Sequence, residues 1–223
     1  MAVCGEARLN SHLSPSEFAK RKLILAAIRV FAEHGVDSVS LRMINREAGH
    51  KNNSALHYHF GSKMGLIEAM DDFIQQHFDE VREPQLAELE CSVNEGKASI
   101  RDAMEVFVNP YVQIINGHEW GYDAVRTLAR MEFDSNEQVH RLLSQSAGKA
   151  TNRFAKAKRA ILKDMPLRRF KMRLNFVVNF TIQGFADYRN LNMSYLGNLS
   201  PKNLDELANF YVDMGEAVFT APN

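Results

Sequence analysis

Residues 35–65, GVDSVSLRMINREAGHKNNSALHYHFGSKMG, concentrate polar and basic side chains that can contact DNA. Asn can bind adenine through two hydrogen bonds in the major groove, while Ser, His and Tyr can reach base edges or phosphates. The segment places Asn53, His57 and Tyr58 close together in sequence. Lys63 follows at a predicted helix start, where an ammonium and backbone N–H groups can together hold a phosphate. These residue types indicate a surface that binds DNA.

An enzymatic site is the main alternative from another class, and the sequence gives it little support. No Gly-rich phosphate loop, nucleophile elbow or carboxylate pair at a helical spacing useful for catalysis is present. His57 and His59 lie two residues apart, so on a helix they point to different faces and do not predict a metal site. We therefore expect no metal and no cofactor, and a helical enzyme is the less favoured interpretation. The scattered histidines are His12, His34, His77, His118 and His140.

The helices that must position the DNA-contacting side chains have clear end signals. Ser14 can cap a first helix, Pro15 suits its first position, and Glu17 completes a capping box. The helix is expected to end at Gly35, where a left-handed conformation is favoured. Its apolar stripe consists of Phe18, Leu23, Ile24, Ala27, Ile28 and Phe31.

Two short predicted helices follow, joined by a tight turn. Ser40 can cap the second helix, Leu41–Ala48, and Gly49 stops it. Asn52 can cap the third helix, which runs toward Phe60. Two helices joined in this way form a helix-turn-helix, whose second helix enters the DNA major groove.

The remainder of the chain also predicts helices, because Gly and Pro separate long segments with a period of 3.6 residues. A long helix is expected from Lys63 to about Glu90, with Pro84 as a candidate kink. The further predicted helices are Ala98–Ile115, Glu119–Phe133, Asn136–Lys163, Leu167–Asn192 and Pro201–Phe219. The predicted fold class is all-α. A three-helix DNA-binding domain with the helix-turn-helix is expected at residues 14–65, and a helical ligand-binding and dimerisation domain at residues 66–223.

Charge is unevenly distributed along the chain, although the formal net charge is zero. Residues 1–65 carry nine Lys and Arg against five Asp and Glu, so the remainder is mildly acidic. A basic N-terminal module can be steered toward phosphate.

The chain has no apolar run of the roughly 18 residues that a membrane helix needs, so we expect no membrane partner. Cys4 and Cys91 lack metal-ligand spacing, and two such cysteines are typical of a protein in the reducing cytoplasm. We therefore expect a cytoplasmic protein.

Residues Ile24–Met70 resemble the DNA-binding domain of the tetracycline-repressor (TetR) family. Each matching piece is short, but their combination is specific. The pieces are Ile24–Ala27 (ILAA), Phe31–Gly35 (FAEHG), Val39–Leu41 (VSL), Ala48–Gly49 (AG) and Tyr58–Lys63 (YHFGSK). The resemblance implies a DNA-binding transcription regulator that responds to a small molecule.

The resemblance also implies which residues contact DNA. Ser40 and Arg42 would contact phosphate or the groove edge from the second helix, and Lys63 would hold the DNA backbone. The recognition helix would present Asn53, Ser54, Ala55, His57, Tyr58 and His59.

One departure from the family spacing affects this assignment. From Gly49 to Tyr58 the sequence has one residue more than is usual. Alignment backward from Tyr58 places Lys51 in the turn and Asn52 at the helix cap. The roles of Lys51, Asn52 and Asn53 in DNA binding each shift by one position if the additional residue is placed elsewhere in the turn.

A regulator of this kind is expected to bind paired half-sites on double-stranded DNA as a homodimer. Residues 175–186 (NFVVNFTIQGFA) are apolar on more than one face, and the final predicted helix carries another apolar stripe. Two such helices from each subunit can form a four-helix interface, and the alternative is that both complete the core of one subunit. The candidate interface residues are Phe176, Phe180, Gln183, Gly184, Leu207, Phe210, Tyr211 and Met214.

The effector pocket is expected on the consecutive predicted helices that span residues 98–133. Aromatic and Met side chains can form an adaptable apolar cavity, in which Arg126 or Arg130 would meet a carboxylate or phosphate. The alternative is that these side chains form ordinary core. The expected ligand is hydrophobic, with or without an anionic group, of the acyl, steroid or aromatic type. The candidate residues are Phe107, Tyr111, Ile114, Trp120, Tyr122, Arg126, Arg130, Met131 and Phe133.

A second basic run allows three interpretations. It could hold the phosphates of a coenzyme A thioester, contact DNA, or form a solvated helix face, and its helical spacing favours the solvated face. The run consists of Lys149, Arg153, Lys156, Lys158, Arg159, Lys163, Arg168, Arg169, Lys171 and Arg173.

These expectations combine into a mechanism. Ligand entry would shift the helix at Glu119–Phe133, and that helix would move the long helix that follows Lys63. The two recognition helices would then no longer match half-sites roughly one turn of DNA apart. A repressor is the favoured interpretation, and an activator of the same fold is the alternative.

Overall fold

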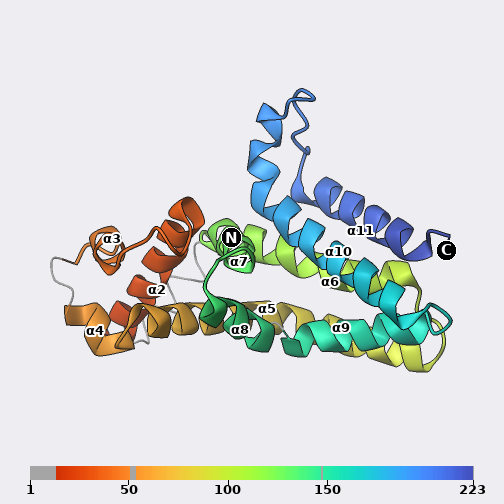
Figure 1. Cartoon of the computed structure of the whole chain (residues 1–223), viewed down its shortest axis with the longest axis horizontal. Coiled ribbons are helices and arrows are strands. Elements are labelled where there is room, and N and C mark those ends of the chain that lie inside the picture. Colours follow the sequence, from red (N-terminus) through yellow and green to blue (C-terminus); the bar gives the residue numbers. More distant parts are fainter. Residues whose placement is uncertain (1–13, 51–53, 147, 223) are drawn as a thin grey trace. The chain divides into compact units, whose positions relative to one another are not determined.

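The computed structural model describes residues 14–50, 54–146 and 148–222 (Figure 1). Every regular element in these ranges is a helix, which confirms the all-α prediction. In chain order the elements are α2 (Pro15–His34), α3 (Leu41–Glu47), α4 (Ser54–Phe60), α5 (Lys63–Asn94), α6 (Ile100–Gly117), α7 (Gly121–Glu132), α8 (Glu137–Ser146), α9 (Gly148–Ile161), α10 (Leu167–Asp187), the 3₁₀ helix η1 (Tyr188–Met193) and α11 (Leu204–Thr220). None of these helices has both the length and the apolar character that a bilayer crossing requires.

The ends of the first helices follow the local signals in the sequence. The Ser14 hydroxyl accepts a hydrogen bond from the Glu17 backbone N–H at 3.3 Å, and the Glu17 carboxylate accepts one from the Ser14 N–H at 2.9 Å. Gly35 ends α2 with a φ of 79°, a conformation that strains residues with a Cβ. Ser40 begins α3 by accepting from the Met43 N–H at 3.4 Å. The predicted cap at Asn52 lies outside the described residues.

One predicted helix in the C-terminal part changes type before its expected end. The predicted helix Leu167–Asn192 becomes the tighter η1 after Asp187. The helix predicted over Asn136–Lys163 is described as α8 up to Ser146 and as α9 from Gly148, on either side of a position outside the described residues. The long helix predicted to about Glu90 runs to Asn94 as α5 and contains Pro84 in its interior. Helical periodicity continues past Asp187, so the apolar pattern alone could not locate the change to η1.

The described residues fall into two compact units. Unit 1 comprises the described residues of 14–76 together with Ile115–Ser146, and unit 2 comprises His77–Ile114 together with the described residues 148–222. The chain passes from one unit to the other within α5 and again within α6. Helix α7 therefore belongs to the same unit as the N-terminal helices.

In unit 1, α2 packs against both α3 and α7. Thr127 of α7 is fully buried, and its hydroxyl donates to the Ile28 carbonyl of α2 at 2.9 Å. The guanidinium of Arg130 donates to the Glu33 carbonyl at 3.2 Å. These bonds join α7 to two successive turns of α2, in addition to the apolar packing between the helices.

In unit 2, aromatic rings from α6, α9, α10 and α11 form a continuous cluster. Tyr111 of α6 stacks on Phe185 of α10 with ring centroids 5.3 Å apart, and Phe185 contacts Tyr211 of α11 at 5.2 Å. Phe107 of α6 continues the cluster to Phe154 of α9 at 5.6 Å. The cluster is the apolar centre of unit 2 and connects four of its helices.

Helices α10 and α11 approach closely at a glycine. A Cβ atom at Gly184 would lie 1.6 Å from the Tyr211 hydroxyl oxygen, so any larger residue would displace the tyrosine ring. The small residue at position 184 thus serves a contact within the subunit.

Candidate DNA-binding site

Helix α3 is held against α2 with its basic residues outward. Ile44 and Ala48 are buried, while Arg42 is exposed. The guanidinium of Arg29 on α2 donates to the Glu47 carboxylate on α3 at 2.8 Å. Ser40 is exposed, and its hydroxyl is the cap of α3. The arrangement places the predicted phosphate contacts Ser40 and Arg42 on the solvent side of α3.

Helix α4 has one buried anchor and an exposed polar face. Leu56 is buried, whereas His57 and Tyr58 are exposed, the Tyr58 side chain to 80%. His59 is half-buried, with its ring centroid 5.0 Å from that of Tyr58. A large ring as exposed as Tyr58 contributes little to the core, so it is available to a partner.

The remaining members of the predicted recognition set lie at the start of α4. Ala55 is half-buried, and Ser54 is the first residue of α4. Lys51, Asn52 and Asn53, including the additional residue relative to the family spacing, lie outside the described residues. Their DNA contacts stay predictions.

Lys63 is half-buried and has a partner within the protein. Its Nζ donates to the Val36 carbonyl at 2.6 Å, which joins the start of α5 to the segment between α2 and α3. The Ser62 hydroxyl accepts from the Gly65 N–H at 3.0 Å and caps the same end of α5. A phosphate contact by Lys63 stays a prediction, and it would have to share the ammonium with Val36.

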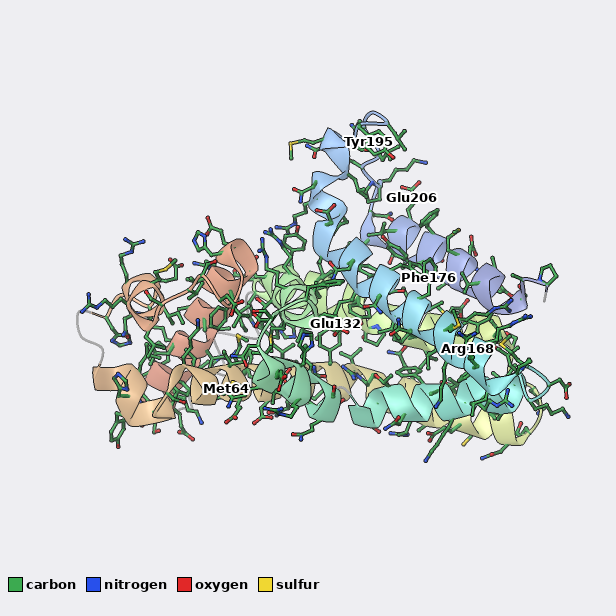
Figure 2. The ribbon with its side chains drawn as sticks, viewed as in Figure 1. Met64, Glu132, Arg168, Phe176, Tyr195 and Glu206 are labelled. Atoms are coloured by element: carbon green, nitrogen blue, oxygen red, sulfur yellow. The ribbon has the colours of Figure 1, made fainter. Side chains whose placement is uncertain are left out.

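The predicted interface residues divide by exposure on α10 and α11. Phe176, Phe210 and Met214 are exposed to 57%, 56% and 44%, and Figure 2 shows Phe176 on α10. Phe180, Gln183 and Gly184 are half-buried, and Leu207 and Tyr211 are buried. The set therefore includes an apolar surface formed by both helices.

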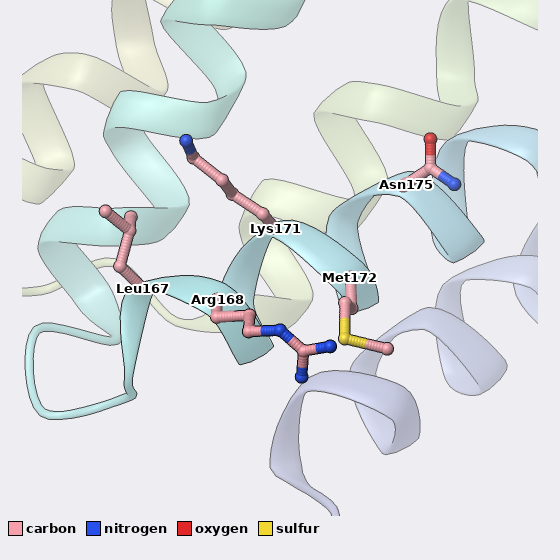
Figure 3. A pocket seen from close by; sticks show the side chains of 5 residues that line it. All are labelled: Leu167, Arg168, Lys171, Met172 and Asn175. Atoms are coloured by element: carbon pink, nitrogen blue, oxygen red, sulfur yellow. The ribbon is translucent and has the colours of Figure 1, made fainter.

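An open groove of about 530 Å³ lies at the start of α10. Arg168 and Met172 extend to one side of the helix and Lys171 to the other (Figure 3). The remaining residues that line the groove are Leu167 and Asn175. The groove lies on the same helix as Phe176 and extends the surface that this helix leaves uncovered.

The predicted effector residues are divided between the two units. Phe107, Tyr111 and Ile114 belong to unit 2, where the two rings lie in the aromatic cluster. The other six candidates, all from residues 120–133, belong to unit 1. Arg130 contacts the Glu33 carbonyl, and Phe133 is 70% exposed. Arg126 lies over the Tyr122 ring at 5.6 Å. Trp120, Tyr122 and Met131 are buried.

Lys158 and Arg153 differ most clearly from the solvated face expected of the second basic run. Lys158 is fully buried in unit 2. Arg153 forms hydrogen bonds with the carboxylates of Glu90 and Glu83 on α5, and these bonds raise its pKa. The signal for Lys158 is its spacing, because it lies four residues after the buried Phe154 and thus on the same helix face.

Comparison with known families covers both parts of the chain. The profile of the bacterial regulatory proteins of the tetR family matches residues 23–70, and the tetracyclin repressor-like C-terminal domain matches residues 105–217. The first match confirms the resemblance of Ile24–Met70. A search of curated protein sequences gives no significant match.

Solved structures share the fold at low sequence identity. The fatty acid degradation regulator FadR from Bacillus halodurans is 12% identical, with 94% of this chain and 97% of that chain covered and a TM-score of 0.58. FadR from Bacillus subtilis, solved in complex with stearoyl-CoA, is 14% identical, with coverages of 91% and 99% and a TM-score of 0.58. A TetR-family regulator from Bordetella parapertussis 12822 is 15% identical, with coverages of 91% and 94% and a TM-score of 0.55.

Proposed function

Because the chain belongs to the TetR family of bacterial regulatory proteins, and is therefore a DNA-binding transcriptional regulator rather than an enzyme, we propose that it is a repressor. It acts in the cytoplasm as a homodimer and binds two half-sites of an operator. A small hydrophobic effector releases it. An activator of the same fold is the alternative.

The main support for the DNA-binding assignment is that one side of α4 is buried and the other side is exposed. Leu56 anchors the helix in unit 1, while His57 and Tyr58 project into solvent. Arg42 is exposed on α3. A short helix with polar and aromatic side chains outward, preceded by a capped helix with exposed Arg, supports insertion of α4 into the major groove. We propose residues 14–65 as the module that contacts DNA.

The apolar surface of α10 and α11 supports a dimer through these helices. Phe176, Phe210 and Met214 are more exposed than large apolar side chains usually are, and such patches mark interaction sites. A two-fold contact would place the same surface of a second copy against them. Two helices from each subunit would then form a four-helix interface.

The contacts of α7 support a route from effector to DNA. Thr127 and Arg130 join α7 to α2, and α2 packs on α3. A ligand that moves α7 would therefore change the position of α2, and with it the geometry of α3. The ligand can shift the DNA-binding equilibrium only as far as it prefers the non-binding state.

The proposed effector is hydrophobic and of the acyl, steroid or aromatic type. The aromatic cluster of unit 2 supports this class, because rings and apolar side chains dominate sites for such ligands. FadR from Bacillus subtilis was solved with stearoyl-CoA. The shared fold makes an acyl compound a reasonable first candidate for screening.

The proposal is tested by a fluorescence-anisotropy titration of the purified protein. The DNA is its own promoter region and a scrambled duplex at one physiological salt concentration. A preference of about a thousandfold for the promoter supports sequence-specific regulation. Lower transcript yield from that promoter in a purified transcription assay would identify a repressor, and higher yield an activator. Equal weak binding to both duplexes would contradict autoregulation through this promoter.

Tyr58→Ala tests the recognition helix directly. The substitution should weaken promoter binding at least tenfold and leave the thermal midpoint of unfolding unchanged, because the ring is 80% exposed. Tyr195→Ala is the matched control, since this tyrosine is 95% exposed on the segment between η1 and α11 (Figure 2). Promoter affinity that stays at the wild-type value in Tyr58→Ala would remove Tyr58 from the DNA contacts.

A further inference from the structure

Unit 2 contains a buried lysine ammonium enclosed by aromatic rings. Lys158 of α9 has an exposed fraction of 0%, and its Nζ has no hydrogen-bond partner among the described residues. The Nζ lies 4.5 Å from the ring centroid of Phe107, 5.4 Å from that of Phe219 and 5.9 Å from that of Phe154. The rings come from α6, α11 and α9, so three helices surround one amino group.

An ammonium in this position is unfavourable without an anionic partner. Ring faces attract a cation, but they replace only part of its hydration. Burial accordingly lowers the pKa of Lys158 to about 7, and no charged neighbour contributes to this shift. An apolar side chain of similar length would fill the same volume without this cost.

Arginines of the surrounding helices bind groups other than Lys158, and no acidic side chain contributes to the pKa of Lys158. On α9, Arg153 binds Glu90 and Glu83, and Arg159 donates to the carbonyls of Leu162 and Met165. On α6 and α11, Arg101 binds Asp213 and Glu216. On α10, Arg173 donates to the carbonyls of Phe219 and Ala221. In the described part of unit 2, Lys158 is thus a buried cation for which no acid is supplied.

A buried hydroxyl in the same unit is also without a partner. Thr181 of α10 is fully buried, and its Oγ1 has no hydrogen-bond partner among the described residues. It lies one helical turn before Phe185, which belongs to the aromatic cluster. Unit 2 therefore contains a second buried polar group without a partner among the described residues, in addition to the Lys158 ammonium.

We propose that Lys158 is the anchor for the acid group of the effector, and that the effector is an amphipathic carboxylic acid. Its carboxylate binds the Lys158 ammonium, and its apolar body lies against the rings of Phe107 and Tyr111. Phe107 lies nearest to the Nζ of the three rings, so the carboxylate and the apolar body of one ligand can contact adjacent groups. This inference rests on the proposed function, because it names the chemical class of the effector.

Binding of the effector carboxylate to Lys158 changes the number of protons that the protein holds. Above pH 7 the amine of Lys158 is mostly neutral, and the bound anion favours the ammonium form. Binding therefore takes up a proton from solvent, close to one per subunit at pH 8. A neutral ligand at the same place takes up none. Calorimetric titrations in two buffers with different ionisation enthalpies measure this number.

Two fluorescent dyes test the proposal without knowledge of the natural effector. The anionic probe is 1-anilinonaphthalene-8-sulfonate, whose sulfonate stands in for the carboxylate. The neutral probe is N-phenyl-1-naphthylamine, which has the same rings and no acid group. Each is titrated into full-length wild type, Lys158→Met and the control Lys156→Met, whose lysine is exposed on the same helix.

The expected result is specific to one probe and one variant. Lys158→Met should bind the anionic dye at least about tenfold more weakly, the loss typical of removing a charged hydrogen-bond partner. Its affinity for the neutral dye should stay within twofold of wild type, and Lys156→Met should match wild type for both. Equal anionic-dye affinity in Lys158→Met and wild type would overturn the proposal. An equal loss for both dyes would also overturn it, because it would indicate altered packing.

The promoter titration separates this inference from the proposed function. Loss of anionic-dye binding in Lys158→Met, in a protein that shows no promoter preference, would support the anion site and contradict autoregulation through this promoter. Promoter preference together with unchanged dye binding would support the regulator and overturn the anion site.

Discussion

Replacing Lys158 by Met is expected to stabilise the folded protein, and the gain should depend on pH. The substitution removes a fully buried ammonium that lacks an acceptor and puts a flexible apolar side chain of similar length in its place. A buried charge without a partner is one of the few features whose removal increases stability.

The magnitude follows from the two pKa values of the lysine. Its pKa is 10.5 in the unfolded chain and about 7 in the folded protein, where burial disfavours the ammonium. Between these values the unfolded chain holds one more proton, so wild-type stability rises with pH; below about pH 7 both states are protonated and the penalty is complete. At about 1.4 kcal/mol per pKa unit, the penalty is about 4 kcal/mol at pH 7 and about 2 kcal/mol at pH 9.

The assay is urea unfolding followed by circular dichroism at pH 7, 8 and 9, with the protein concentration held constant because a dimer is expected. The advantage of Lys158→Met over wild type should fall by about 2 kcal/mol across this range. Lys156→Met, on the exposed side of α9, should follow wild type at every pH. A Lys158→Met protein that is less stable than wild type at pH 7, or whose advantage does not change with pH, would refute the reasoning.

Two further predictions concern the contact between α7 and α2 and the proposed dimer interface on α11. Thr127→Val keeps the shape of a fully buried side chain but removes its hydrogen bond to Ile28, so the free energy of unfolding should fall by about 1 kcal/mol in the same urea assay. An unchanged value would mean that the bond does not hold α7 to α2. Phe210→Glu places a charge on the exposed surface of α11 and should convert the dimer to monomer in sedimentation velocity, with loss of promoter affinity. Phe133→Glu, at a phenylalanine that is 70% exposed outside α10 and α11, is the control, and equal sedimentation of both variants would place the interface elsewhere.

Sequence by itself determined the features whose causes lie within a few residues. The capping box at Ser14 and Glu17, the stop at Gly35 and the cap at Ser40 all form as predicted, because each depends on backbone groups no more than four residues away. The DNA-binding candidates on α3 and α4 could be proposed for the same reason, since a short helix fixes which side chains share a face. The exposure of Tyr58 follows from the buried Leu56 two positions before it.

Only the tertiary structure decided which elements cover one another. Helical periodicity shows that α7 has an apolar face, but it does not show that α2 lies against that face or that Thr127 bonds to Ile28. In the same way, the spacing of Lys158 four residues after Phe154 places it on the same face of α9 as that ring, but it does not show which helices cover this face, whereas Lys156 is exposed. The physical reason is that burial is set by contacts between residues far apart in the chain. Phe107 and Phe219 enclose the Lys158 ammonium from 51 positions before it and 61 positions after it, beyond the reach of any local pattern.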